Sequence, residues 1–280
     1  GVGQIVAEGE RNLVIGRPAN LRKWAAGHLG RARPPKPAPG KLPPRPPTDL
    51  TPIAAAIRWV ETTSPFAQRL AYERLMSRYV PLAKRRDLKP PAWLRLVPAA
   101  PLPDLVIQPG AEGEDVFGPF RDRRAALRAR DALHKHFRIR PCDFDFKPPT
   151  GVPDGLPADL ARALEGAAGV ESIPAWVGRA GARSLVVERG RDGIELYPVA
   201  AGSVLDAAAV TARPEALEDA VGGLAWAAAG PAPDDTPWLN AWRHGRRSGV
   251  EIPVAAGETA AETAGRIRAA VGAGEVPVVG

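Results

Sequence analysis

The sequence has a single cysteine, Cys142, among its 280 residues. A lone cysteine excludes internal disulfides and any metal site that needs several cysteines of one chain. Long hydrophobic runs are also missing: 45% of the residues are apolar, but no run reaches the length of a membrane span. We therefore expect a cytoplasmic protein with no membrane partner.

Lysine is absent from residues 151–280, which carry 11 arginines and 17 acidic residues, a net charge of −6. Residues 1–150 carry 27 basic and 14 acidic residues, a net charge of +13. Such a split between two halves indicates a polyanion as the partner of the basic half. The alternative is that the many arginines only reflect a GC-rich coding sequence.

Proline and glycine are plentiful, with 32 and 29 residues. Proline is densest in a basic loop at residues 30–52, which reads RPPKPAPGKLPPRPPTDLTP from Arg33 to Pro52. This density excludes helix and central strand, so we expect an extended, exposed connection. Binding of the loop to an SH3-like groove or to phosphates is the alternative.

The rest of the pattern predicts an α/β protein of the α+β kind. Capping side chains precede three expected helices, at Asn20, Ser64 and Asp122, and Gly118-Pro119 is expected to form a turn. After the helix that Asn20 opens, the expected helices cover residues 64–79, 122–136, 158–168, 214–229, 236–247 and 258–271. The expected strands cover residues 4–8, 12–15, 57–62, 93–96, 104–107, 184–188 and 194–199.

Three stretches carry a family resemblance. Residues 14–29, VIGRPANLRKWAAGHL, resemble the second half of a GIY-YIG nuclease module, roughly Y-V-G-K-A-K-N-L-R-K-R, of the kind found in the UvrC subunit of the bacterial excinuclease. Ser64 and Pro81 match the S-x-F…L-I-K…R-P pattern of the same family. Residues 116–142, VFGPFRDRRAALRARDALHKHFRIRPC, are similar to the F-G-P-Y/F…L…L-F-x-L-R-x-C segment that follows this module. In the family, the terminal cysteine belongs to a cluster, but Cys142 has no partners here.

The sequence predicts three regions, and the resemblance covers the first two. Residues 1–100 form a GIY-YIG-like mixed sheet flanked by helices, and residues 101–150 form a UvrC-like segment with a basic helix. Residues 151–280 form a separate, small, acidic α/β region of unknown role. The chain opens at Gly1, where the family has a lead-in before its first strand. We therefore expect a piece of a longer polypeptide, by analogy one that carries an exonuclease domain.

Catalysis in the family is understood to need two tyrosines, a lysine and an arginine, together with a metal-binding glutamate. The two tyrosines fall on Gly3 and Val14 of this sequence, whose side chains transfer no proton. The arginine falls on Trp24, which either stacks on a base or, as we expect, packs in the core. The lysine becomes Arg17, which keeps a positive charge but not a deprotonatable amine.

Two further positions of the site are altered. The family's later tyrosine falls on His28, which we interpret as a surface histidine. The metal-binding glutamate falls on Tyr72, next to Glu73. A shift of one residue turns a helix by about 100°, so Glu73 reaches the site only if the helix is rotated or bulged. His134 and His136 are too isolated for a metal site.

These substitutions predict a pseudo-nuclease with no metal cofactor, which binds DNA in nucleotide-excision-type DNA repair or assists a linked exonuclease or repair protein. The expected DNA-binding residues are Arg17, Arg22, Lys23, Arg123, Arg124, Arg128 and Lys135. Two alternatives stay open. One is an active endonuclease with Mg²⁺ or Mn²⁺ and a rebuilt site around Arg17, His28 and Glu73. The other is a protein-interaction module without catalysis.

Overall fold

The structure is a computed structural model that describes residues 1–30, 48–81, 84–85, 88–97, 103–137, 155–164, 177–205, 209–226, 234–245 and 248–274. The chain divides into two compact units, Gly1–Arg85 and Arg86–Val278. Most of the proline-rich loop and Cys142 lie outside the described residues. The helices and the antiparallel sheets confirm the expected α+β class.

The first unit is built on a three-stranded sheet with the order β2-β1-β3. Its strands are β1 (Val2–Val6), β2 (Asn12–Gly16) and β3 (Ala56–Val60). β1 and β2 correspond to the strands expected over residues 4–8 and 12–15, and they form a hairpin with the short 3-10 turn η1 (Glu8–Glu10) between them. Both strand pairings are antiparallel, so the sheet is not the mixed sheet that we expected.

Two helices of the first unit begin at the caps that the sequence predicts. α1 (Leu21–His28) starts after Asn20, whose side chain accepts a hydrogen bond from the backbone N–H of Lys23 at 2.9 Å. α2 (Pro65–Tyr79) starts after Ser64, which accepts from the N–H of Ala67 at 3.2 Å. These contacts satisfy backbone donors that the first helical turn leaves without a partner.

One face of α2 is buried and combines apolar side chains with a carboxylate. Phe66, Leu70 and Glu73 are its buried residues, whereas Tyr79 at the end of the helix is 38% exposed. The three buried residues follow the i, i+4, i+7 spacing of one helix face. A carboxylate therefore occupies a position that an apolar residue usually takes.

The second unit begins with a four-stranded antiparallel sheet of order β5-β4-β6-β7. Its strands are β4 (Ala92–Val97), β5 (Asp104–Gln108), β6 (Val116–Phe120) and β7 (Gly178–Arg179). Because β4 pairs with β5 and β6, the first unit ends at Arg85 and not near residue 100. The expected turn at Gly118-Pro119 is wrong, since both residues lie inside β6. The β4–β6 pairing is irregular between Ala92 and Leu94, which is where a strand tolerates proline.

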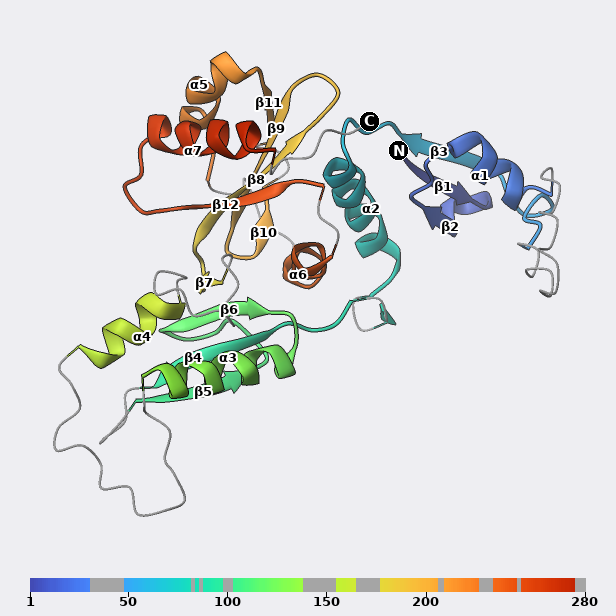
Figure 1. The fold of residues 1–280 in the computed structure, drawn as a ribbon. Helices are drawn as coiled ribbons and strands as arrows, with labels where there is room; N and C mark the ends of the chain where they lie inside the picture. The colour runs from blue at the N-terminus through green and yellow to red at the C-terminus, as the bar shows by residue number, and fades with distance from the viewer. Residues whose placement is uncertain are drawn as a thin grey trace, which may run out of the picture. The chain divides into compact units, whose positions relative to one another are not determined.

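α3 (Arg123–His136) and α4 (Leu156–Leu164) cover one face of this sheet (Figure 1). Asp122 caps α3 as expected, accepting from the N–H of Ala125 at 2.9 Å. Leu133 of α3 and Leu160 of α4 are fully buried against the sheet residues Leu94 and Phe117. The opposite face of α3 is exposed and carries most of its charged residues.

A five-stranded antiparallel sheet completes the second unit. Its strands are β8 (Arg183–Arg189), β9 (Ile194–Ala200), β10 (Ser203–Val204), β11 (Val210–Ala212) and β12 (Val250–Val254). The order is β10-β9-β8-β12, and β11 pairs with β9. β8 and β9 form a hairpin and correspond to the strands expected over residues 184–188 and 194–199. β12 has no counterpart among the expected strands.

Helices lie on both faces of this second sheet (Figure 1). On one face are α5 (Leu217–Gly222), which follows the 3-10 turn η4 (Pro214–Ala216), and α7 (Ala260–Gly272). α6 (Thr236–His244) lies on the other face, because its Arg243 bonds Glu251 while the neighbouring Ile252 points into the α5–α7 core. Within the described ranges, no helix has the length and apolar character needed to cross a membrane.

Candidate functional site

The sheet face that the resemblance assigns to catalysis is filled by the indole ring of Trp24. Gly3 of β1 and Gly16 of β2 are paired in the sheet, so they present the same face to α1. A Cβ atom built on Gly3 would lie 2.6 Å from Cζ3 of Trp24, and one on Gly16 would lie 2.7 Å from Nε1. Only glycines let the ring lie this close to the strands. Trp24 is half-buried and α1 has no buried residue, so the ring packs on the sheet surface and not in the core that we expected.

Val14 lies on the sheet face of Gly16, and His28 contacts the Trp24 ring. Val14 lies on the same strand as Gly16, two residues earlier, and pairs with Ile5. His28 meets the indole edge-on, with the ring centroids 5.2 Å apart and the planes at 71°. The structure therefore brings Gly3, Trp24 and His28 together, as a packed cluster of rings over glycine.

Arg17 and Tyr72 form a second contact in the first unit. The guanidinium carbon of Arg17 lies 4.8 Å from the centroid of the Tyr72 ring, within the range of a cation–π interaction. Arg17 is exposed at the end of β2, so its charge stays accessible to an anion from solvent. Tyr72 stands where the resemblance places the metal-binding glutamate, and its phenol ring orients the guanidinium of Arg17.

Glu73 is buried and ion-paired. Its side chain is 2% exposed, and it meets Nε of Arg69 at 2.5 Å as well as Nη1 of Arg85. α2 runs without interruption from Pro65 to Tyr79, so no bulge turns Glu73 toward another side. Its charge is compensated by two guanidinium groups. Among the described residues, no group of three or more His, Cys, Asp or Glu side chains is arranged to hold a metal ion.

The other expected DNA-binding residues lie on two exposed helix surfaces. Arg22 and Lys23 are exposed on α1, in the first unit. In the second unit, Arg123, Arg124, Arg128 and Lys135 are exposed on α3. Within the described part of the chain, none of these six cations forms an ion pair with a carboxylate.

On α3, three of the cations form a stripe along the helix. Arg124, Arg128 and Lys135 are separated by four and seven residues, which places them within about 40° of one another around the helix axis. Asp131 falls within the same stripe, but its carboxylate meets Arg130 at 3.4 Å. The stripe is therefore predominantly positive.

A cavity in the second unit is the feature that sequence reasoning missed. Its volume is about 880 Å³, and its lining includes Trp93, Arg179, Arg183 and Arg266. These residues come from three strands and a helix that lie far apart in the sequence, so no motif marks them. The only sequence signal is a set of arginines in an otherwise acidic half of the chain.

Comparison with known proteins gave no matching family model, no matching curated protein and no matching solved structure. The GIY-YIG and UvrC-like interpretation therefore depends on the sequence motifs of the first half.

Proposed function

We propose that this protein is a UvrC-like, GIY-YIG-like protein that has lost nuclease catalysis and binds DNA through phosphate contacts. Its role would be in DNA repair of the nucleotide-excision kind, or as an accessory to a linked exonuclease domain. The observation that carries the DNA-binding part is the exposure of six cations on α1 and α3 without acidic partners among the described residues. The loss of catalysis is supported by Trp24 on the sheet face and by the ion pairs of Glu73.

Binding of this kind should depend strongly on salt and weakly on sequence, because phosphates carry the contacts. If all six cations meet phosphates, the logarithm of the binding constant for a DNA duplex falls against the logarithm of salt concentration with a slope of about −5. Reversing Arg124→Glu and Arg128→Glu together should weaken binding and make this slope shallower by about 2. Fluorescence anisotropy with a labelled duplex measures both quantities.

A matched control makes the same change of charge elsewhere. Arg213→Glu and Arg268→Glu alter two exposed arginines of the acidic half and should leave the slope nearly unchanged. Absence of binding by the unaltered protein at low salt would remove the proposal. Equal weakening by the control pair would show that net charge, and not the α3 stripe, governs binding.

The same preparations test the loss of catalysis. We expect no nicking of a supercoiled plasmid in Mg²⁺ or Mn²⁺, and metal-dependent nicking by the unaltered protein would overturn this part. A Glu73→Gln variant is not decisive here, because it removes the partner of two arginines. Breaking such a buried pair costs about 3–5 kcal/mol, so lost activity would also follow from unfolding.

A further inference from the structure

The cavity of the second unit has the size of a small-molecule site. Its volume of about 880 Å³ lies within the roughly 300–1,000 Å³ usual for ligand pockets. Two segments that contain glycine form part of its wall: β7 with the turn that follows it, residues 178–182, and the turn at residues 255–257. Cβ atoms built on Gly181 or Gly257 would meet no atom within 4 Å, so both turns leave open space beside the backbone.

Arginine dominates the charged lining of this cavity. Four arginines line it, together with one carboxylate, that of Glu251. Arg243 donates to both oxygens of Glu251, at 2.6 and 2.5 Å, so this pair is neutral overall. Nη1 of Arg179 donates to Asp115 at 2.8 Å. Arg266 in turn meets the carboxylate of Glu258 at 3.0 Å. The surplus positive charge among these four arginines therefore comes from Arg183.

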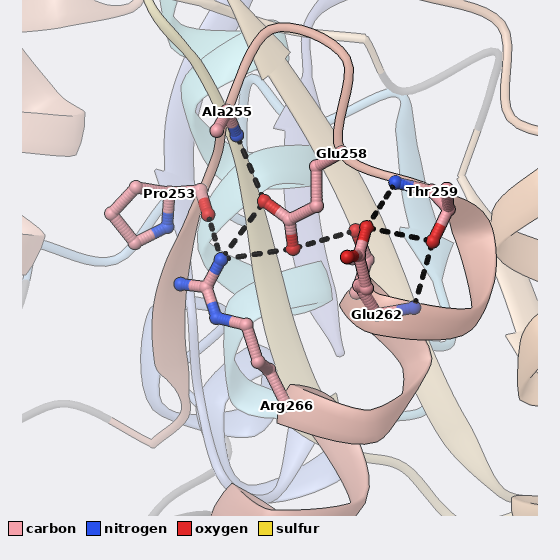
Figure 2. A network of polar contacts seen from close by, with 7 residues as sticks. Pro253, Ala255, Glu258, Thr259, Glu262 and Arg266 are labelled. Atoms are coloured by element: carbon pink, nitrogen blue, oxygen red, sulfur yellow. Dashed lines mark hydrogen bonds and ion pairs between the residues drawn. The ribbon is translucent and has the colours of Figure 1, made fainter.

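Only one of the three guanidinium nitrogens of Arg266, Nη1, donates hydrogen bonds to described residues. Nη1 donates to the carbonyl oxygen of Pro253 at 2.8 Å and to both carboxylate oxygens of Glu258 at 3.0 Å (Figure 2). Nε and Nη2 have no partner among the described residues, and Figure 2 shows them on the side away from Glu258. This leaves a guanidinium edge with two parallel donors.

Glu258 is fixed in turn by groups around it. It accepts from the backbone N–H of Ala255 and the hydroxyl of Thr263, both at 2.9 Å. Burial acts to raise the pKa of Glu258, but these two hydrogen bonds and that of Arg266 outweigh it, so the pKa is lowered. The carboxylate is therefore ionised at neutral pH and keeps the guanidinium of Arg266 oriented.

We propose that this cavity binds a small organic anion whose carboxylate or phosphate group meets the free edge of Arg266. Two parallel N–H donors match two oxygens of either group in a bidentate fork. Arg183, whose guanidinium lies 5.5 Å from the centroid of Trp226, supplies a second positive charge to the same cavity. Trp93, Pro119 and Val254 give the lining apolar surface for the body of the ligand.

Titration of the full chain tests the proposal with three probes: inorganic phosphate, citrate and adenosine monophosphate. Calorimetry and thermal unfolding should show binding of at least one organic probe, tighter than that of inorganic phosphate. Arg266→Gln should weaken binding about tenfold or more, because the charge-assisted fork is lost. Arg183→Gln should weaken it less. Arg268→Gln on the same helix, whose Nε faces the carbonyl of Pro214 at 3.4 Å, should leave affinity unchanged.

Arg266→Lys covers the case in which the glutamine variant does not fold, because it keeps the charge and removes only the fork. It should unfold at nearly the temperature of the unaltered protein and still bind the probe more weakly. Three results would overturn the proposal: no binding of any probe at millimolar concentration, equal affinity of the Arg266 variants, or equal weakening by Arg268→Gln. Arg266→Gln should leave duplex binding unchanged, which separates this site from the proposed DNA surface.

Discussion

At the scale of single residues, Trp24 and the two glycines beneath it depend on one another. The indole lies on Gly3 and Gly16, which face the same side of the sheet because they are paired. A larger side chain at Gly3 or Gly16 would need the space that the ring occupies. The indole of Trp24 therefore requires glycine at both strand positions.

Gly3→Ala should destabilise the first unit by about 1–3 kcal/mol, because its methyl group overlaps the indole in a packed interior. Urea unfolding measures the change. Gly27→Ala on α1 is the matched control, since its Cβ would meet no atom within 4 Å, and it should stabilise by up to about 1 kcal/mol. Combining Gly3→Ala with Trp24→Ala should cost less than the sum of the two changes. An additive result would contradict the contact.

At the scale of elements, the local signals in the sequence were reliable. Asn20, Ser64 and Asp122 each accept from a backbone N–H three residues later, as their positions before apolar-periodic segments predict. Elements that depend on distant partners were missed. β6 contains Gly118-Pro119, which indicates a turn, and β12 contains Pro253; both are strands because neighbours far along the chain pair with them.

Asp122→Ala should destabilise α3 by about 1 kcal/mol at neutral pH, because the helix loses its N-cap. The N–H of Ala125 lowers the pKa of the Asp122 carboxyl. Because the pKa is lowered in the folded state, the cap stabilises α3 fully at neutral pH. This stabilisation declines as the pH falls through about 4, the usual pKa of aspartate, and it is lost below the folded-state pKa. Denaturation curves at neutral and acidic pH check this.

Asp122→Asn is the control for the cap itself. Its amide oxygen accepts the same hydrogen bond without titrating, so it should retain most of the stability of α3 and remove this contribution to the acid dependence. If the alanine and asparagine variants were equally destabilised, a charge effect and not the cap would explain the loss.

At the scale of the whole molecule, the sites differ in how far the sequence predicts them. Arg124 and Arg128 could be assigned to one exposed surface because both belong to a single helix with a regular period. The burial of Glu73 was missed, because one of its partners, Arg85, lies 12 residues away in a loop. The cavity could not be predicted from the sequence, because Trp93, Arg183 and Arg266 come from two different sheets and a helix, and only the tertiary fold brings them to one place.

The division into two units predicts that each unit unfolds cooperatively by itself. The sheet of the first unit pairs only residues of 1–85, and both sheets of the second unit pair only later residues. A destabilising change should therefore lower stability within its own unit, because local free energies follow cooperative regions. In full-chain hydrogen exchange, Gly3→Ala should speed exchange in β1, β2 and β3, whereas Asp122→Ala should speed it in α3 and β4. If either variant accelerated exchange equally in both units, the chain would unfold as one cooperative body.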